Sequence, residues 1–495
     1  MTLSYPPEAL VLAAVLIPFI GALLIPLFHS VPNLREAVTL ATAGALFLTL
    51  FGLLGPVLGG ARPEALNIEV VPGLALAFRV EPLGMLFALI ASGLWIVTSI
   101  YSIGYMRGNG EPRQTSYYVC FAVALGCTIG IAFAKNLFTL FLFYEALTLS
   151  TYPLVAHKAN AEAIRAGRIY LLLLLGTSLV LLLPAIVVTW ALAGTIDFTP
   201  GGILEGKASG AVIGLLLALY AFGIGKAALM PLHFWLPAAM VAPTPVSALL
   251  HAVAVVKAGV FTIVKVVVYV FGTGVLARNG AADWLVYLAS ASLLLASLVA
   301  LTRDNLKALL AYSTVSQLAY VVVGASLANA TSIIGSGLHI ATHAVGKITL
   351  FFCAGAIYTA LHKTEISEMI GIGRKMPITM TAFLIGSLSI IGLPPFAGTW
   401  SKWTLALGAL DAGHAFVVGV LMVSSVLSAA YLLPIVARAF FLPSLSGGGG
   451  TDGLREAPGA CVFALCLTAF LCVVLFFQAG NVQTLLEGIF APQQR

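Results

Sequence analysis

The sequence predicts an all-α, polytopic membrane protein, and this rests on its composition, on recurring apolar runs and on the scarcity of long polar segments. Of its 495 residues, 60% are hydrophobic and 8% are charged, whereas an ordinary soluble protein carries roughly 25% charged residues. Apolar runs long enough to cross a bilayer, about 20 residues each, recur from end to end. The net charge of +6 lies mostly in short loops, so its location does not point to a nucleic-acid partner.

The apolar runs and their breakers mark about fourteen transmembrane helices. They begin near residues 8, 37, 79, 116, 136, 166, 210, 244, 282, 305, 331, 377, 413 and 458. The first run lacks a basic leader and a small-residue cleavage site, so we expect a retained helix and not a signal peptide. A glycine-rich stretch at 444–458 is typical of a flexible linker before the last helix.

Two blocks of five helices share one irregularity, a helix broken by prolines. The expected units are 1–115 (helices 1–3), 116–273 (helices 4–8), 282–441 (helices 9–13) and 458–495 (helix 14). The breaks fall at Met230–Pro237 in helix 7 and at Gly392–Gly398 in helix 12. Because five is odd, the second block is turned over relative to the first. Inverted repeats with broken helices are typical of transporters that bind ions near the bilayer midplane.

The loops differ in their content of Lys and Arg. One set holds Arg35, Arg107, Arg113, Lys158, Arg165, Arg168, Arg303, Lys307, Lys363, Arg374, Lys375, Arg438 and Arg455, and the other holds Arg62, Lys135, Lys207, Arg278 and Arg495. Cytoplasmic loops are enriched in basic residues, so thirteen against five places the first set in the cytoplasm. With an even number of helices, both termini then lie outside the cytoplasm. We expect a prokaryotic cell (inner) membrane.

Nine ionisable side chains fall within the predicted spans. They are Glu145, Lys226, His251, Lys257, Lys265, His339, His343, Lys347 and Lys402. Each lysine at mid-bilayer costs about 3 kcal/mol even on the lenient insertion scale, so five cost about 15 kcal/mol. That equals the whole stability of a typical domain. These groups must therefore be paired, hydrated or neutral, which predicts an ion path; the alternative is that buried pairs only hold helices together.

Particular spacings indicate proton transfer. Glu145 is the one acid within a predicted span, and Lys226, directly before the first break, is its expected partner. An ion pair that opens and closes would change the proton affinity of the lysine. His339, His343 and Lys347 recur at i, i+4 and i+8 on one helix face. Because a lysine would repel a metal ion, this ladder predicts a proton relay and not a metal site.

The other basic positions extend this path. His251 and Lys257 are six residues apart, so they line one path only if their helix is broken or if both flank a file of water. Lys402 follows the second break as Lys226 precedes the first, and it is the predicted outlet. Lys265 either snorkels to the outer interface or has no role.

The cysteines give no indication of a cofactor. Cys120, Cys127, Cys353, Cys461, Cys466 and Cys472 lie in apolar runs, with no CxxC pair and no histidine at zinc-like spacing. We interpret them as small core residues and expect no metal, no disulfide and no cofactor. The sequence also lacks a nucleotide fingerprint, an iron–sulfur cysteine set and a haem ligand pattern.

Five motifs resemble the antiporter-like subunits of respiratory complex I, of membrane-bound hydrogenases and of Mrp-type cation/proton antiporters. They are the helix around Glu145 and the stretches Gly225–Pro237, Ala242–His251, Lys307–Gln317 and Gly392–Pro395. The resemblance spans about residues 110–440 and implies fourteen helices, of which the seventh and twelfth are discontinuous. It implies ion-path roles at the positions Glu145, Lys226, Lys257 and Lys402. Lys402 departs from one complex I member, which has glutamate there, and favours the Mrp D-type and hydrogenase-type relatives.

The resemblance also implies partners, namely homologous antiporter-like subunits and small helical membrane subunits. One hypothesis is an ion-translocating subunit of a redox-driven complex, with a hydrogenase or quinone-reductase module. A second is a component of a secondary cation/proton antiporter without a redox partner. A third is a structural membrane scaffold with no ion path of its own, for which removing the buried charges would leave transport intact. The sequence does not separate the first two, nor H⁺ from Na⁺ as the cargo.

Overall fold

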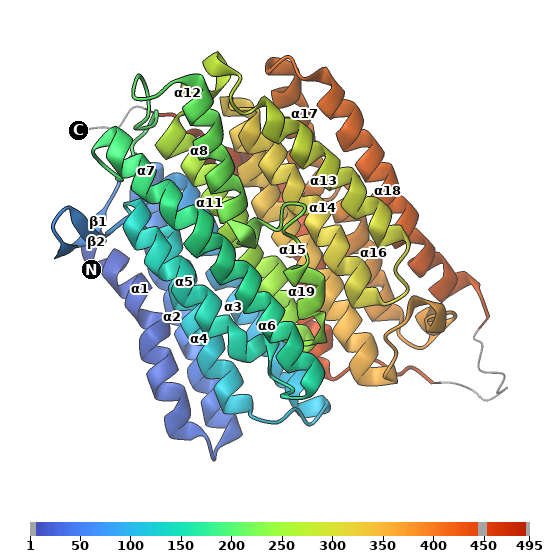
Figure 1. Cartoon of the computed structure of the whole chain (residues 1–495). Coiled ribbons are helices and arrows are strands. Elements are labelled where there is room, and N and C mark those ends of the chain that lie inside the picture. Colours follow the sequence, from blue (N-terminus) through green and yellow to red (C-terminus); the bar gives the residue numbers. More distant parts are fainter. Residues whose placement is uncertain (1–5, 444–452, 492–495) are drawn as a thin grey trace.

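A bundle of long helices makes up almost all of the protein (Figure 1). The computed structural model describes residues 6–443 and 453–491. The predicted linker at 444–458 therefore lies mostly outside the described residues. Within them, twelve helices are long and apolar enough to cross a membrane, and two shorter apolar helices, Gly210–Gly223 and Pro377–Ile391, begin the remaining predicted spans. All fourteen expected spans are thus present, and each begins within five residues of its predicted start.

The first half of the chain contains helices 1 to 8. Its elements are α1 (Pro7–Leu24), η1 (Ile25–Phe28), α2 (Pro32–Leu58), β1 (Glu64–Val71), β2 (Leu74–Arg79), α3 (Pro82–Gly108), α4 (Gln114–Ala132), α5 (Leu137–Val155), α6 (Ala161–Thr177), η2 (Ser178–Leu182), α7 (Leu183–Ala193), α8 (Gly210–Gly223), η3 (Gly225–Ala227), α9 (Trp235–Ala238), η4 (Ala239–Val241), α10 (Thr244–Ala248), η5 (Leu249–Val253), α11 (Val255–Val266) and η6 (Val267–Phe271). Helix 6 is the continuous rod 161–193, and helix 8 is the continuous rod 244–271.

The second half contains helices 9 to 14. Its elements are α12 (Thr273–Asn279), α13 (Asp283–Leu301), α14 (Leu306–Ser326), α15 (Ala330–Leu361), η7 (Ile366–Glu368), η8 (Ile372–Arg374), α16 (Pro377–Ile391), α17 (Gly398–Asp411), α18 (Ala415–Phe441) and α19 (Gly459–Glu487). α15 packs extensively against α17, α19, α16 and α14. The helix that carries the predicted histidine ladder is therefore at the centre of this half.

Helices 7 and 12 are discontinuous, as predicted. Helix 7 ends as a regular helix at Gly223 and continues through the 3-10 turn η3 to the short helix α9. Helix 12 ends at Gly392, which has φ +91° and closes α16 in the left-handed conformation, before α17 begins. Proline at the break cannot donate a backbone hydrogen bond, which is why an α-helix cannot run through either site.

One element of this mostly helical fold was not predicted. Strands β1 and β2 pair as an antiparallel hairpin between helices 2 and 3, at the left edge of Figure 1. β-Branched residues at Ile68, Val70 and Val71 favour the strand, and Gly73, with φ +81°, makes the turn. The segment is too short and too polar to cross a membrane, so sequence inspection placed it in a loop.

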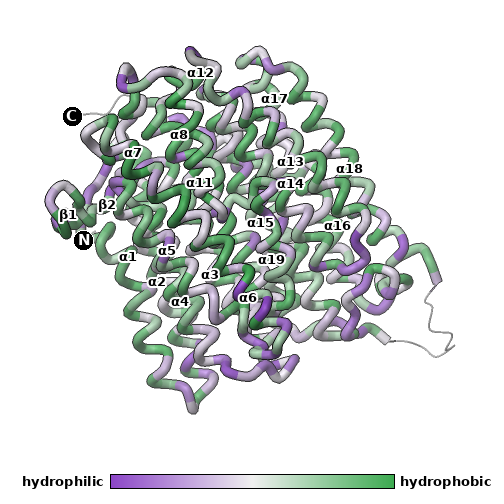
Figure 2. The backbone as a smooth tube through the Cα atoms, in the orientation of Figure 1, coloured by the Kyte–Doolittle hydropathy of each residue, from purple (hydrophilic) through white to green (hydrophobic). Residues whose placement is uncertain are grey.

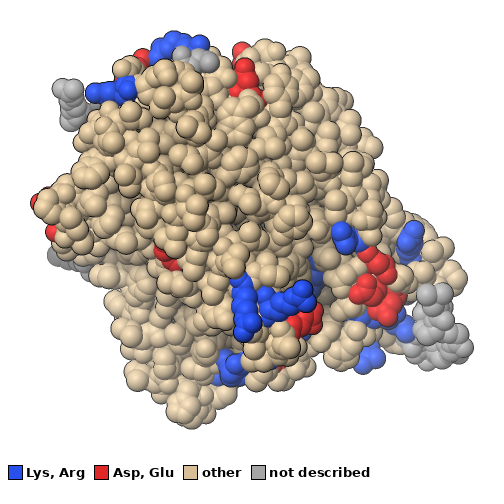
Figure 3. Space-filling view, viewed as in Figure 1, with Lys and Arg blue, Asp and Glu red and all other residues tan. Residues whose placement is uncertain are grey.

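Polar residues gather at the two ends of the bundle. In Figure 2 the hydrophilic segments concentrate at helix ends and connections, while in Figure 3 charged side chains leave a broad uncharged band between them. We call the end at which α2, α6 and α14 begin the basic side, because it holds the predicted cytoplasmic loops. The hairpin and α12 lie at the opposite side.

The two five-helix runs share a detail that supports their prediction as repeats. Asn136 caps α5, the second helix of the first run, and forms an isolated bridge with Asp197, which follows the third helix. Asn305 caps α14, the second helix of the second run, and bridges Glu365, which again follows the third helix. Both broken helices are fourth in their run. The division into inverted repeats stays a prediction.

Candidate functional site

Lys226 is wholly enclosed at the first helix break. Its Nζ donates to the Tyr144 carbonyl at 2.8 Å and to Thr148 Oγ1 at 2.6 Å, and it lies 3.2 Å from the centroid of the Tyr144 ring. The Lys226 backbone N–H donates to the Tyr144 hydroxyl at 3.1 Å. The side chain has no solvent-exposed surface. Neutral groups of α5 therefore hold this amine, which limits the cost of removing it from water.

Glu145 lies one residue beyond Tyr144 on the same helix, but it does not form an ion pair with Lys226 in this structure. Both of its carboxylate oxygens are buried without a hydrogen-bond partner, although the charges of the two groups act on each other. A buried carboxylate without a partner is unfavourable. In this structure the predicted pair of Glu145 and Lys226 is therefore separated.

Close backbone packing positions the first break. A Cβ at Gly259 on α11 would lie 2.3 Å from the Lys226 carbonyl carbon, and a Cβ at Gly225 would lie 2.3 Å from Thr177 Oγ1. The Gly225 carbonyl accepts both the Ala228 backbone N–H at 3.0 Å and the Trp235 indole N–H at 3.1 Å, so the indole adds a side-chain bond to the turn at the break. Helix 8 therefore packs closely against the break in helix 7 that carries Lys226.

A direct contact joins the two halves of the molecule. Lys257 Nζ on α11 lies 2.5 Å from His343 Nδ1 on α15, and both side chains are buried. A hydrogen bond between an amine and a ring nitrogen needs one of the two to be the acceptor, so one of these groups is neutral at that atom. The two nitrogens can accordingly share and exchange a proton.

The contact continues along α15 toward the second break. The rings of His343 and His339 stack with their centroids 6.0 Å apart. His339 Nδ1 lies 3.0 Å from Ser401 Oγ on α17, and its ring stacks on Tyr320 with centroids 5.0 Å apart. Lys402 Nζ lies 4.8 Å from the same Tyr320 ring. The ladder predicted from the i, i+4 spacing therefore reaches the lysine of the second break through Ser401 and Tyr320.

Lys402 is half-buried. Its Nζ donates to the Ile391 carbonyl and to Ser425 Oγ, each at 2.9 Å. The side chain lines a largely apolar cavity of about 980 Å³ between α16, α17 and α18, which also includes the exposed side chains of Trp400 and Trp403. The second break thus opens to the periphery of the bundle, whereas the first is enclosed.

Lys347 and His251 lie beside this line of contacts. Lys347 Nζ donates to Ser313 Oγ at 2.8 Å, and Ser313 also receives a hydrogen bond from the Tyr431 hydroxyl. His251 packs on Phe351 with ring centroids 4.7 Å apart, and both of its buried ring nitrogens are unpaired in the described structure. Its segment, η5, is a π-helix, so helix 8 is irregular at His251 but continuous, and a path lined by both His251 and Lys257 stays a prediction.

The alternative that Lys265 snorkels to the outer interface is wrong, whereas the alternative that it has no role in the path stays a prediction. Its fully buried Nζ lies 3.3 Å from Glu81 Oε2 and donates to the Ala134 carbonyl at 2.8 Å. Glu81 also binds Arg79 at 2.9 Å, and Arg79 lies 3.7 Å from Glu64. These charges connect helix 8 to the hairpin, and spacing along the chain could not reveal the pairing because its members are far apart in sequence.

Two further expectations are corrected. Glu36 is the fifth residue of α2, where it is buried and contacts Arg107 at 2.5 Å, so Glu145 is not the only acid within a spanning helix. All six cysteines are free, and four are buried, but Cys466 is exposed and Cys120 is partly exposed, so these two are not core residues. Among the described residues, no three His, Cys, Asp or Glu side chains are grouped to hold a metal ion.

The hydroxyl groups of the site were not identified from the sequence. Thr148, Ser313, Ser401 and Ser425 each hydrogen-bond a lysine or a histidine of the site. Ser and Thr are frequent in membrane helices and bond the preceding turn, so their type alone carries little information. Only Ser401 had a local signal, because it precedes Lys402 directly.

The sequence and the fold were compared with those of known proteins. The family described as NADH:quinone oxidoreductase/Mrp antiporter, transmembrane region, matches residues 134–428. NADH-quinone oxidoreductase subunit N of Desulforudis audaxviator is 32% identical over 419 residues, which is 84% of this chain and 82% of the relative. Hydrogenase-4 component B of Escherichia coli is 29% identical over 432 residues, or 82% of this chain and 63% of that longer protein.

The fold is similar to that of a solved membrane complex. A chain in the structure of the Mrp complex from Dietzia sp. DQ12-45-1b aligns with a TM-score of 0.84 at 20% identity, covering 100% of this chain and 98% of that chain. At that identity the likeness concerns the fold alone. The chain is thus a polytopic antiporter-like membrane subunit, and it belongs to the NADH:quinone oxidoreductase/Mrp antiporter family.

Proposed function

We propose that this chain translocates protons through a line of buried basic side chains near the middle of the membrane. The observation that supports this most directly is the 2.5 Å contact between Lys257 and His343. It connects helix 8 of the first half to helix 11 of the second, and both side chains are buried. Proton exchange between an amine and an imidazole needs no other group.

The proposed path has three parts. Lys226 and Glu145 form a coupled site at the first break, whose opening or closing changes how strongly Lys226 holds its proton. Lys257, His343 and His339 carry the proton across the centre, with His251 and Lys347 beside them. Lys402 is the outlet at the second break. In this proposal the basic side is cytoplasmic and both termini are extracytoplasmic, in accordance with the bias of basic residues in the loops.

The donor set favours H⁺ over Na⁺. The path consists of amines, imidazoles and hydroxyl groups, whereas Na⁺ requires several oxygen ligands. Two carbonyls beside the path, that of Tyr144 on α5 and that of Ile391 at the second break, are each bound by the amine of a lysine, which in its charged form would repel a cation.

The chain is proposed to act with homologous antiporter-like subunits and small helical membrane subunits. The relatives named above belong to oxidoreductases, a hydrogenase and an Mrp complex. A redox-driven complex and a secondary antiporter both use such a subunit. Identification of the proteins that co-purify with this chain separates the two, because a hydrogenase or quinone-reductase module is present only in the first.

Substitution of the coupled site tests the proposal. Lys226→Ala and Glu145→Ala in the assembled complex should each abolish or greatly reduce ion transport, measured with a pH-sensitive dye in membrane vesicles, while co-purification shows that assembly is retained. Lys135→Ala, which removes a lysine bound to Glu64 on the opposite side, is the matched control and should transport normally. Near-normal transport by both coupled-site variants would instead support the scaffold hypothesis.

Cysteine labelling tests the orientation. A reporter thiol near Gln493 should react with an impermeant reagent in intact cells, and one near Gly448 should not. The reverse pattern would place the basic side outside the cytoplasm and would reverse the proposed direction of the path.

A further inference from the structure

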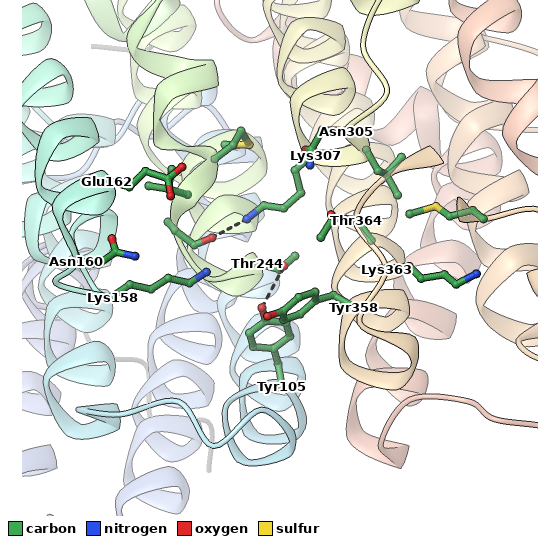
Figure 4. A pocket seen from close by; sticks show the side chains of 16 residues that line it. Tyr105, Lys158, Asn160, Glu162, Thr244, Asn305, Lys307, Tyr358, Lys363 and Thr364 are labelled. Atoms are coloured by element: carbon green, nitrogen blue, oxygen red, sulfur yellow. Dashed lines mark hydrogen bonds between the residues drawn. The ribbon is translucent and has the colours of Figure 1, made fainter. Parts of the chain in front are cut away.

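A cavity of about 380 Å³ lies on the basic side, between the two halves of the molecule (Figure 4). It is lined from α3 by Tyr105, from α10 by Thr244, from α14 by Lys307 and from α15 by Tyr358. Lys158, Glu162 and Lys363 are at its rim. A polar space of this size can hold several water molecules.

Lys307 is a basic side chain that lines this space and points into it. Its Nζ donates to the Ala242 carbonyl at 2.6 Å, as the dashed line in Figure 4 shows. An ammonium group has three protons to donate, so two remain for water in the cavity. Sequence inspection had assigned Lys307 to a loop, but it lies in the first turn of α14.

Thr244, which lines the cavity, lies on the same helix as His251 and Lys257 of the proposed proton path. The Thr244 hydroxyl donates to the Tyr105 hydroxyl at 3.4 Å. Thr244 and His251 lie seven residues apart on helix 8, which corresponds to about 10 Å along the axis. His251 has two unpaired buried nitrogens, and the charge of Lys307 acts on its ring. Lys257, which contacts His343, is less than two turns farther along the same helix.

An acid lies just outside the rim. Glu111 Oε2 is 3.9 Å from His157 Nε2. Burial raises the pKa of the Glu111 carboxyl, while the charges of Lys158 and Lys307 act to lower it. Burial and Arg113 lower the pKa of His157. A carboxyl that holds its proton closer to neutral pH is suited to exchange protons with water at the mouth of a cavity.

We infer that this cavity is the cytoplasmic proton inlet and that Lys307 is a further proton-transferring residue of the path. The inference rests on the proposed function and adds a residue to it. Neutral Lys307 accepts a proton from hydronium in the cavity, leaving water; the resulting ammonium passes that proton through water to a neutral His251 nitrogen and becomes neutral again. The Ala242 carbonyl holds the amine in place during both steps.

Substitutions at Lys307 separate proton transfer from a fixed structural charge. Lys307→Arg keeps the charge and a donor for the Ala242 carbonyl, but guanidinium does not release its proton. We expect transport in vesicles to fall by about tenfold or more in Lys307→Arg and in Lys307→Met, with assembly retained. Lys363→Arg, at the rim, is the matched control and should transport normally.

The outcomes also separate this inference from the proposed function. If Lys307→Arg transports like the unmodified complex while Lys226→Ala does not, Lys307 is a structural charge and only the inference is overturned. If Lys226→Ala also transports normally, the proposed function fails as well.

A second measurement tests the inference if the Lys307 variants fail to assemble. A thiol at Thr244→Cys should react with a small charged reagent supplied from the basic side, above the background of the native cysteines. Thr262→Cys, fully buried on the same helix, should not react. An unreactive Thr244→Cys would show that the cavity is closed to water and would overturn the inference.

Discussion

The two broken helices hold their lysines in the same way but in different surroundings. Lys226 and Lys402 each donate to one backbone carbonyl and one hydroxyl, and each lies over a tyrosine ring. Lys226 is enclosed and has an acid, Glu145, one residue from its carbonyl partner, whereas Lys402 is half-buried beside an apolar cavity. The matching hydrogen-bond partners therefore do not by themselves determine the role of each lysine in transport. A nearby charge can control the proton of the first, and hydration can control that of the second.

The largest expected effect is at the enclosed lysine. Lys226→Arg keeps a positive charge near Glu145 but cannot release a proton, and the larger guanidinium has no free space beside Tyr144 and Thr148. Transport should fall at least as far as in Lys226→Ala, by about tenfold or more. Dye-monitored proton uptake in vesicles measures this, with co-purification as the assembly check. Transport at the unmodified rate would mean that Lys226 is only a fixed charge.

The next largest effect on transport is expected at the half-buried lysine, Lys402. Lys402→Arg should also lower transport strongly, since an outlet must release its proton, but Lys402→Glu should retain part of it. A carboxyl group can bind and release a proton as an amine does, and Lys402 is only half-buried, so an acid there is less costly than in an enclosed site. The matched substitution Lys226→Glu, beside Glu145, should retain none, because two acids would then share an enclosed site. Equal rates for Lys402→Glu and Lys226→Glu would remove the proposed difference between the breaks.

Glu145→Gln should have an intermediate effect. It keeps the shape of the side chain and removes the charge that acts on Lys226, so the pH dependence of transport should shift more than the maximal rate. The same measurement on Lys402→Ala should show a lowered rate without such a shift, because no acid is paired with Lys402 in the described structure. An unchanged pH profile for Glu145→Gln would argue against coupling at the first break.

The sequence predicted the positions of the helices and breaks but not the connections between them. The fourteen spans and the two interruptions follow from hydropathy and from proline and glycine, which act locally. The His339 and His343 stack also follows from helical spacing. By contrast, the Lys257–His343 contact joins residues 86 positions apart, and the Lys265–Glu81 pair links helix 8 to the start of helix 3. Such pairings depend on how the helices pack, and no local pattern in one sequence encodes them.

The smallest expected effect distinguishes the two sites by their hydroxyl groups alone. Thr148→Val and Ser425→Ala each remove the hydroxyl that receives a hydrogen bond from a lysine, at 2.6 Å and 2.9 Å respectively. A hydrogen bond to a charged group contributes about 1.5–3 kcal/mol, and losing it costs most where the remaining partner stays buried. In the enclosed site no water can take the place of Thr148, so the ammonium form of Lys226 should be disfavoured and transport should fall by about tenfold. Lys402 is only half-buried, so the loss of one hydrogen bond costs less there, and Ser425→Ala should change transport by less than about twofold. Because both substitutions leave every charge in place, a larger loss in Ser425→Ala than in Thr148→Val would show that Lys402, and not Lys226, is the lysine that depends on an enclosed environment.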